Sequence, residues 1–112
     1  AGCDLNQAMS DGRTPAFLAA EKGQTAALEL LVKVPGCDVN QATRDGRTPA
    51  YIAAQGGHTA ALEVLVKTGC DVNQADMHGQ TPAFIAAARG HTAALVLLVK
   101  AGCDVKKAAK NG

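Results

Sequence analysis

The chain has 112 residues, of which 47% are hydrophobic and only 3% aromatic, and its formal net charge is +1. This balance gives no reason to expect nucleic acid or a membrane surface as a partner, and no apolar run approaches the roughly 20 residues that span a bilayer. Three of the eleven basic residues lie within the last seven positions, so the rest of the chain, with eight basic and ten acidic residues, is slightly acidic.

The sequence repeats itself with a period of 33 to 34 residues. The motif Gly-Cys-Asp-Leu/Val-Asn-Gln-Ala begins at positions 2, 36 and 69, and its first four residues return at position 102. A Thr-Pro pair follows each full motif, at positions 14, 48 and 81. A fixed period in this range predicts a stacked array, in which each unit buries its apolar face against its neighbours. We therefore expect one array over residues 1–112, with repeats of about 2–35, 36–68 and 69–101 and a partial fourth repeat at 102–112.

The middle repeat opens with signals for a turn and a first short helix. Asp45-Gly46 is typical of a tight turn, because Gly accepts the positive φ that such turns demand. In Thr48-Pro49 the Thr hydroxyl can cap a helix, and Pro is favoured at the first helical position. We expect a helix over residues 50–55, ended by Gly56-Gly57.

A second helix is expected over residues 59–67 of the same repeat, because its apolar residues follow the spacing of one buried stripe. Gly69 ends this helix, and the following segment 70–77 is so short and rich in turn residues that we expect an extended, hairpin-like link. Isolated helices of eight or nine residues are marginal in water, so both helices need neighbouring repeats to hold them.

The combination of these signals resembles the ankyrin repeat over nearly the whole chain: a turn with Gly-x-Thr-Pro, two helices separated by Gly, and Gly-x-Asp-Val-Asn. The resemblance implies an all-α repeat array (an ankyrin-like solenoid) of helix-turn-helix pairs with projecting β-hairpin loops. It also implies a curved stack with the loop tips and first helices on its concave side. Neither end resembles a polar capping repeat, so we expect apolar layers to be exposed at the ends.

Four cysteines, Cys3, Cys37, Cys70 and Cys103, occupy the same position of successive repeats. Equivalent positions in stacked helical layers should lie roughly 10 Å apart, whereas a disulfide needs Cα atoms within about 7 Å. No Cys-x-x-Cys pair or His at metal-ligand spacing accompanies them. We expect four buried free thiols, which fit the reducing cytoplasm.

The repeats differ from one another mainly at the loop tips and at the ends of the first helices. The second and third repeats differ at 10 of 33 positions, and five of these differences fall in that region, which the resemblance places on the concave side. A constant framework with a varied surface is typical of a binding face, although exposed positions also drift without function. The candidate partner-binding residues are Ser10, Asp11, Arg13, Glu21, Lys22, Arg44, Asp45, Arg47, Gln55, Met77, His78, Gln80 and Arg89.

No set of residues in the sequence predicts catalysis. The chain has one Ser and three His, and His58 and His91 are repeat-equivalent loop residues for which a structural role is expected. The P-loop and the Gly-x-Gly-x-x-Gly pattern are both missing. Asp38, Asp71 and Asp104 recur once per repeat and are expected to accept hydrogen bonds in the loops. We therefore expect no enzyme, no catalytic residues, no metal site and no cofactor.

The sequence favours a module that binds another protein through the concave face, as a cytoplasmic monomer without nucleic-acid, membrane or small-molecule partners. One alternative is a structural spacer, or an engineered or excised repeat fragment, with no specific ligand of its own. A further alternative is a passive substrate of protein hydroxylases at Asn40 or Asn73, which resemble the asparagine modified in some ankyrin repeats.

Overall fold

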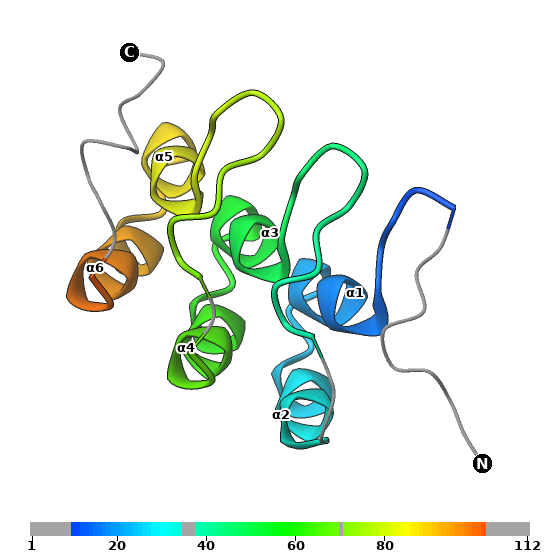
Figure 1. Ribbon diagram of the computed structural model, residues 1–112. Helices are drawn as coiled ribbons and strands as arrows, with labels where there is room; N and C mark the ends of the chain where they lie inside the picture. Colours follow the sequence, from blue (N-terminus) through cyan, green and yellow to red (C-terminus); the bar gives the residue numbers. More distant parts are fainter. Residues whose placement is uncertain (1–9, 35–37, 70, 103–112) are drawn as a thin grey trace.

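Three pairs of short helices make up the described part of the chain, which comprises residues 10–34, 38–69 and 71–102 of the computed structural model (Figure 1). The helices in chain order are α1 (Pro15–Glu21), α2 (Thr25–Lys33), α3 (Pro49–Gly56), α4 (Thr59–Lys67), α5 (Pro82–Ala88) and α6 (Thr92–Lys100). The prediction of two helices in the middle repeat is confirmed, including the bounds of the second. The longest of these helices have nine residues, well short of the roughly 20 that a membrane-spanning helix needs.

The Thr-Pro pairs start the first helix of each repeat as the sequence predicts. In the middle repeat the buried Thr48 Oγ1 accepts a hydrogen bond of 3.1 Å from the N–H of Tyr51, and Pro49 is the first helical residue. Thr14 and Thr81 do the same in the other two repeats. The cap satisfies one of the N–H groups that a helix start leaves without an intrahelical partner. These three caps therefore fix where each layer begins.

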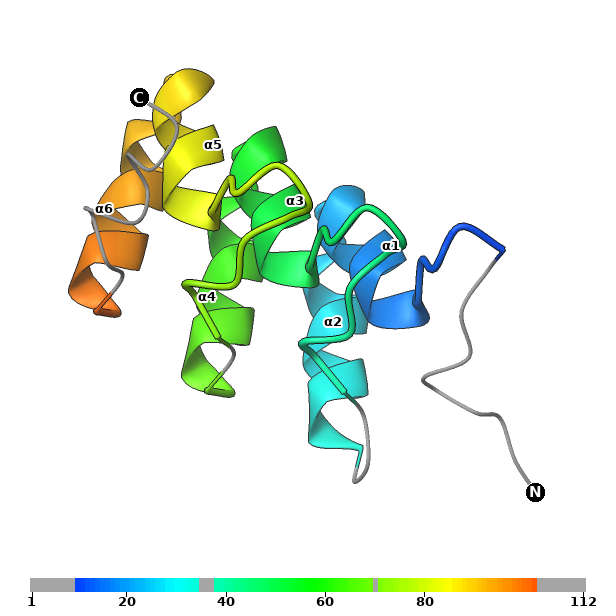
Figure 2. The same ribbon diagram turned by 45° about the horizontal axis from the view of Figure 1, so that its top comes forward.

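The helices form two rows, and the loops project on one side. Helices α1, α3 and α5 lie in one row, α2, α4 and α6 lie in the other, and the loops between repeats extend away from the second row (Figures 1 and 2). The main packing contacts run within each pair and between adjacent pairs. The resulting stack measures 47 × 25 × 20 Å. This is the all-α array of helix-turn-helix pairs that the sequence predicts.

The core consists of Ala on the facing sides of the helices and larger residues between the layers. Ala20, Ala53 and Ala86 are fully buried, and their small side chains let the first helices approach closely. The largest fully buried side chain is Tyr51, followed by Leu residues of the second helices, Leu28, Leu62, Leu65 and Leu98. Burial of such side chains supplies roughly 1.5–3 kcal/mol each, which offsets the marginal stability of short helices.

The second helices of the first and third repeats expose apolar side chains at positions that are half-buried or polar in the middle repeat. Leu30 of α2 is 70% exposed, whereas the equivalent Val64 of α4 is half-buried. In α6, Val96 and Val99 are 47% and 50% exposed. The expectation of apolar layers at the ends agrees with these exposures, because each layer needs a neighbour on both sides to cover its helices.

Polar side chains tie neighbouring layers together in the loops. Asp38 and Asp71 each accept a hydrogen bond of 2.9 Å from the backbone N–H two residues later, as expected for loop residues. Asn40 Oδ1 accepts a bond of 2.9 Å from the N–H of Asp71, one repeat further on. Asp104, for which the sequence predicts the same role, lies outside the described residues, and so do the four cysteines.

His91 has a structural role, as the sequence suggested. Its Nε2 lies 3.0 Å from the carbonyl oxygen of Gln55, at the end of helix α3 in the preceding repeat. Its ring also lies so close to Gly57 that a Cβ there would come within 2.7 Å of Nδ1. The imidazole therefore joins the loop between α5 and α6 to the end of α3, and the small Gly is required beneath it.

Candidate interaction surface

Tight turns form the tips of the projecting loops, which we call the loop tips (residues 10–13, 43–47 and 76–80). In the middle repeat the N–H of Thr43 donates to the Arg47 carbonyl at 2.9 Å, and the N–H of Gly46 donates to the Thr43 carbonyl at 2.9 Å. The third repeat has the same pair of bonds between Asp76, Gly79 and Gln80. None of the described loop residues forms a regular strand, so these turns are held by local bonds.

Each loop tip is bonded to the next along the stack. The N–H of Arg44 donates to the Asp11 carbonyl at 3.1 Å, and the N–H of Met77 donates to the Asp45 carbonyl at 2.9 Å. The backbones approach closely at Gly46, where a Cβ would lie 2.9 Å from Asp76 Cα. The three tips therefore form one continuous surface.

The structure places every predicted binding residue on the loop tips or at the C-terminal ends of α1, α3 and α5. We call this surface the tip face. Its members at the loop tips are Ser10, Asp11, Arg13, Arg44, Asp45, Arg47, Met77, His78 and Gln80, and those at the helix ends are Glu21, Lys22, Gln55 and Arg89. Six of them line one pocket, whereas Met77, His78 and Gln80 belong to the next loop and Ser10 lies exposed beside Asp11.

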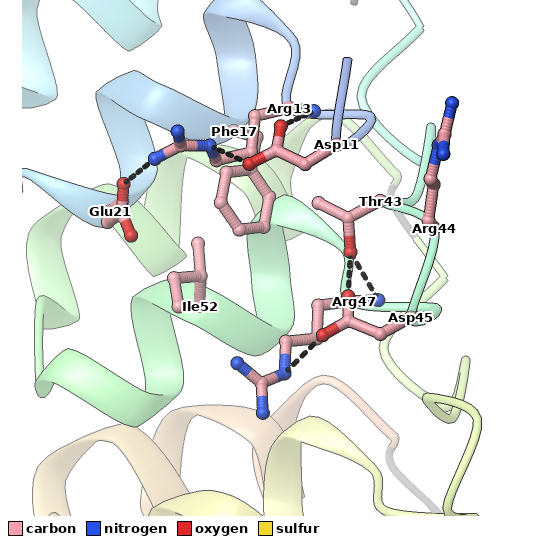
Figure 3. A pocket seen from close by; sticks show the side chains of 9 residues that line it. All are labelled: Asp11, Arg13, Phe17, Glu21, Thr43, Arg44, Asp45, Arg47 and Ile52. Atoms are coloured by element: carbon pink, nitrogen blue, oxygen red, sulfur yellow. Dashed lines mark hydrogen bonds and ion pairs between the residues drawn. The ribbon is translucent and has the colours of Figure 1, made fainter. Parts of the chain in front are cut away.

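The pocket lies between the first and second repeats and has a volume of about 260 Å³ (Figure 3). Arg13 crosses it: its Nε is 2.7 Å from Asp11 Oδ2, and its Nη1 is 3.7 Å from Glu21 Oε1. Phe17 and Ile52 add apolar side chains to the lining. The polar groups can therefore orient a bound segment above a small apolar surface. The full lining is Asp11, Arg13, Phe17, Glu21, Thr43, Arg44, Asp45, Arg47 and Ile52.

A second cluster of polar side chains lies at the middle loop tip. Asp45 Oδ1 accepts a hydrogen bond from the Thr43 hydroxyl, and Asp45 Oδ2 lies 3.5 Å from Arg47 Nε. The hydrogen bond from Thr43 lowers the pKa of the Asp45 carboxyl below its ordinary value of 3.8; burial opposes this change and the Arg47 charge reinforces it. Because the charged form of Asp45 is favoured in the folded chain, ionised Asp45 stabilises this turn.

The lowered pKa gives an expected pH dependence of folding. The contribution of Asp45 is present above the unfolded pKa of about 4 and is lost as the pH falls through the lower folded value. The free energy of unfolding of Asp45→Asn should therefore decline less steeply below pH 4 than that of the unaltered chain. Urea titrations at pH 6 and pH 3 measure the difference. A variant with the same decline as the unaltered chain would show that Asp45 contributes nothing.

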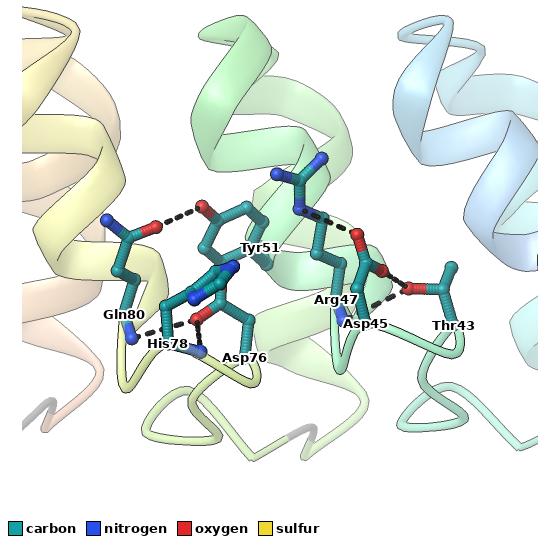
Figure 4. A network of polar contacts seen from close by, with 7 residues as sticks. All are labelled: Thr43, Asp45, Arg47, Tyr51, Asp76, His78 and Gln80. Atoms are coloured by element: carbon teal, nitrogen blue, oxygen red, sulfur yellow. Dashed lines mark hydrogen bonds and ion pairs between the residues drawn. The ribbon is translucent and has the colours of Figure 1, made fainter.

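Tyr51 links the middle repeat to the third (Figure 4). Its ring is 1% exposed, and its hydroxyl donates to Gln80 Oε1 at 3.2 Å. The guanidinium of Arg47 lies over the ring, with Cζ 5.6 Å from the centroid, a geometry that allows a cation–π interaction. Burial raises the pKa of the Tyr51 hydroxyl, and the Asp76 charge adds to the effect, so the phenol stays protonated.

Sequence reasoning missed the residues that support the tip face from below. Asp76 is buried, and its Oδ1 accepts from the N–H groups of His78 and Gln80 at 2.9 and 3.0 Å. In the middle repeat the hydroxyl of Thr43 accepts from the Arg47 N–H at 3.1 Å. The sequence did contain a signal for this support. Thr43 and Asp76 occupy the same position of successive repeats, and both side chains carry an oxygen that can accept a hydrogen bond from a turn.

A larger hollow, of about 420 Å³, lies on the other row, between α2 and α4. Four of the seven repeat positions that line it are identical in all three repeats, among them those of Thr25, Lys33 and Ala60, whereas the positions of Glu29, Val64 and Thr68 vary. We interpret it as the seam between the two layers. The lining residues are Thr25, Glu29, Val32, Lys33, Ala60, Glu63, Val64, Lys67 and Thr68.

The tip face presents charged, polar and apolar side chains. Among the described residues, no group of three or more His, Cys, Asp or Glu side chains could hold a metal ion. The groups present are guanidinium, ammonium, carboxylate, amide, imidazole, hydroxyl and thioether side chains. Such a surface can form hydrogen bonds, ion pairs and apolar contacts with another macromolecule.

The comparisons with known proteins agree with this architecture. The family model described as ankyrin repeats (3 copies) matches residues 1–76 and 17–109. A search of curated proteins found no match. The matched segments cover all six described helices and the loops between them. The chain therefore belongs to the ankyrin repeat family.

Proposed function

We propose that the chain binds another protein through the tip face. Ankyrin repeats are generally protein-interaction modules and are typically not enzymes. The observation that carries the proposal is that six of the ten positions at which the second and third repeats differ lie at the loop tips or first-helix ends, where the tips are bonded into one surface, while the Thr-Pro caps recur unchanged and the core changes only conservatively. With its cysteines as free thiols, the chain would act as a monomer in the cytoplasm.

The tip face also has the composition of an interface. Arg and Met are enriched at the centres of protein interfaces, and here Arg44 and the 68% exposed Met77 lie on loops that the Met77–Asp45 backbone bond holds side by side. The turns that present them are closed by two backbone bonds each, so a partner would lose little affinity to ordering of the loops.

The experiment compares two variants of matched exposure against ligands selected from a displayed peptide library. Arg44→Ala with Met77→Ala should weaken binding by about 30-fold or more, as expected when hot-spot residues are truncated. Both residues are exposed, so folding should be retained. Arg47 is left intact, because it supports Tyr51 and Asp45.

The control variant alters the opposite row of helices, at Glu29, Lys33, Glu63 and Lys67, each changed to Ala. The Lys67–Glu63 pair, at 3.5 Å, is exposed, and exposed pairs contribute at most about 1 kcal/mol, so binding should change by less than about fivefold. Loss of binding in the control and not in the tip-face variant would show that the wrong surface has been assigned. Failure to select any ligand would favour the structural spacer.

A further inference from the structure

The charges of the described residues are unevenly distributed between the tip face and the rest of the array. The tip face has five basic and three acidic side chains, whereas the other described residues include three basic and five acidic ones. The buried Asp76 lies at the third loop tip beneath this face, so the tip region as a whole has five basic and four acidic side chains, whereas the remaining described residues have three basic and four acidic ones. The whole-chain charge of +1 conceals this division.

The three carboxylates of the tip face are ion-paired within their own repeats, whereas the buried Asp76 beneath it accepts from backbone N–H groups instead. Asp11 and Glu21 both bond to Arg13, and Asp45 pairs with Arg47. Their negative charge is thus offset locally, and so is the positive charge of the two arginines. These five groups can therefore offer a partner hydrogen bonds but little net charge.

Three further cations of the tip face remain without a carboxylate partner among the described residues. They are Lys22 at the end of α1, Arg44 at the middle loop tip and Arg89 at the end of α5. Each is exposed, and each belongs to a different repeat. These cations therefore occur one per layer, Arg44 at a loop tip and Lys22 and Arg89 at the C-terminal ends of first helices.

An apolar side chain lies on the loop tip next to that of Arg44. Met77 is 68% exposed, and its backbone N–H is bonded to Asp45, the residue that follows Arg44. A flexible thioether adapts to side chains of different shapes. A complementary segment would therefore carry carboxylates on both sides of one apolar residue.

We propose that the tip face accepts an extended, acidic segment of a partner protein, anchored by an apolar side chain at Met77. This inference rests on the proposed function. A strand-like segment rises about 3.3 Å per residue, so about 14 residues would follow the 47 Å stack. Single-stranded RNA fits less well, because it needs exposed aromatic platforms, whereas Phe17 and Tyr51 are buried and Phe84 is half-buried.

The test selects displayed random peptides of 14 residues on the intact chain. The enriched sequences should have a net negative charge and an apolar residue near the centre. Their affinity should fall by about tenfold between 50 and 300 mM NaCl, because exposed charges are screened. Changing Lys22, Arg44 and Arg89 to Ala should weaken binding by about 30-fold or more.

A matched variant removes the same number of positive charges from the other row. Lys33, Lys67 and Lys100 lie in the last turns of α2, α4 and α6, and changing all three to Ala should weaken binding by less than about threefold. At the anchor, Met77→Ser should cost about tenfold in affinity, whereas Met77→Leu should stay within about twofold.

The outcomes separate this inference from the proposed function. Enriched peptides that need the tip face but are neutral or basic would overturn the acidic segment and leave protein binding intact. Equal losses of affinity in the Lys22/Arg44/Arg89 and Lys33/Lys67/Lys100 variants would also overturn it, because the net charge of the whole chain would then explain the binding. An oligouridine of 14 nucleotides that binds more tightly than the selected peptides would replace a protein partner by RNA. If no peptide is enriched, both proposals fall.

Discussion

Replacement of Tyr51 by Ala is expected to lower the free energy of unfolding by about 3–5 kcal/mol, the usual cost of truncating a buried aromatic residue. Tyr51 is the largest fully buried side chain, and the Ala-rich helices around it have few atoms with which to refill the space. The variant also loses the bond to Gln80 and the contact with Arg47, so the seam between the second and third repeats weakens. Urea denaturation followed by circular dichroism measures the loss.

The control for this prediction is Tyr51→Phe, which keeps the ring and removes only the hydroxyl. Phe occupies the equivalent positions 17 and 84, so the ring should fit. The expected cost is about 0.5–1.5 kcal/mol, the net contribution of one hydrogen bond. If the Ala variant loses less than about 1 kcal/mol, the ring is not an important part of the core.

Gly46→Ala should destabilise the array by about 2–5 kcal/mol. Part of this cost, about 1–2 kcal/mol, is the left-handed backbone at φ +83°, which disfavours any residue with a Cβ. The rest is the collision of the new Cβ with the backbone of the next loop, since Asp76 Cα and the Met77 nitrogen would each lie 2.9 Å away. Chemical denaturation of the purified variant measures the total.

Gly69→Ala is the matched control, because Gly69 has nearly the same backbone angle, φ +84°, but no heavy atom within 4 Å of the added Cβ among the described residues. Its cost should come from the left-handed backbone conformation alone, about 1–2 kcal/mol. The difference between the two variants isolates the close approach of the loop tips. Equal losses would mean that the loops can separate freely.

Much of the fold could be predicted because its signals are local. Thr48-Pro49 and Gly57 act within one helix, so the sequence alone indicates where α3 begins and ends. The stripe of apolar residues in the segment 59–67 likewise predicts α4 from its own spacing. The period adds that the units stack. These features do not depend on how far one layer is displaced from the next.

The contacts between layers could not be predicted, because they depend on that displacement. Nothing in the sequence indicates that Asn40 accepts from Asp71, or that His91 reaches the Gln55 carbonyl of the preceding repeat. Membership of the tip face followed from the differences between repeats. The pairing of Arg13 with both Asp11 and Glu21, which leaves Lys22 without a carboxylate, needed coordinates.

The packing of each helix pair mainly against its immediate neighbours also determines how the array would respond to tension. If the two ends were pulled apart, the seams would be loaded in series, and each would carry the whole force. One repeat could then detach and unravel while the others stayed folded. A released repeat of 33 residues extends to at most about 110 Å, more than twice the 47 Å length of the folded stack. The same stacking that stabilises short helices would therefore make the array a stepwise extensible tether.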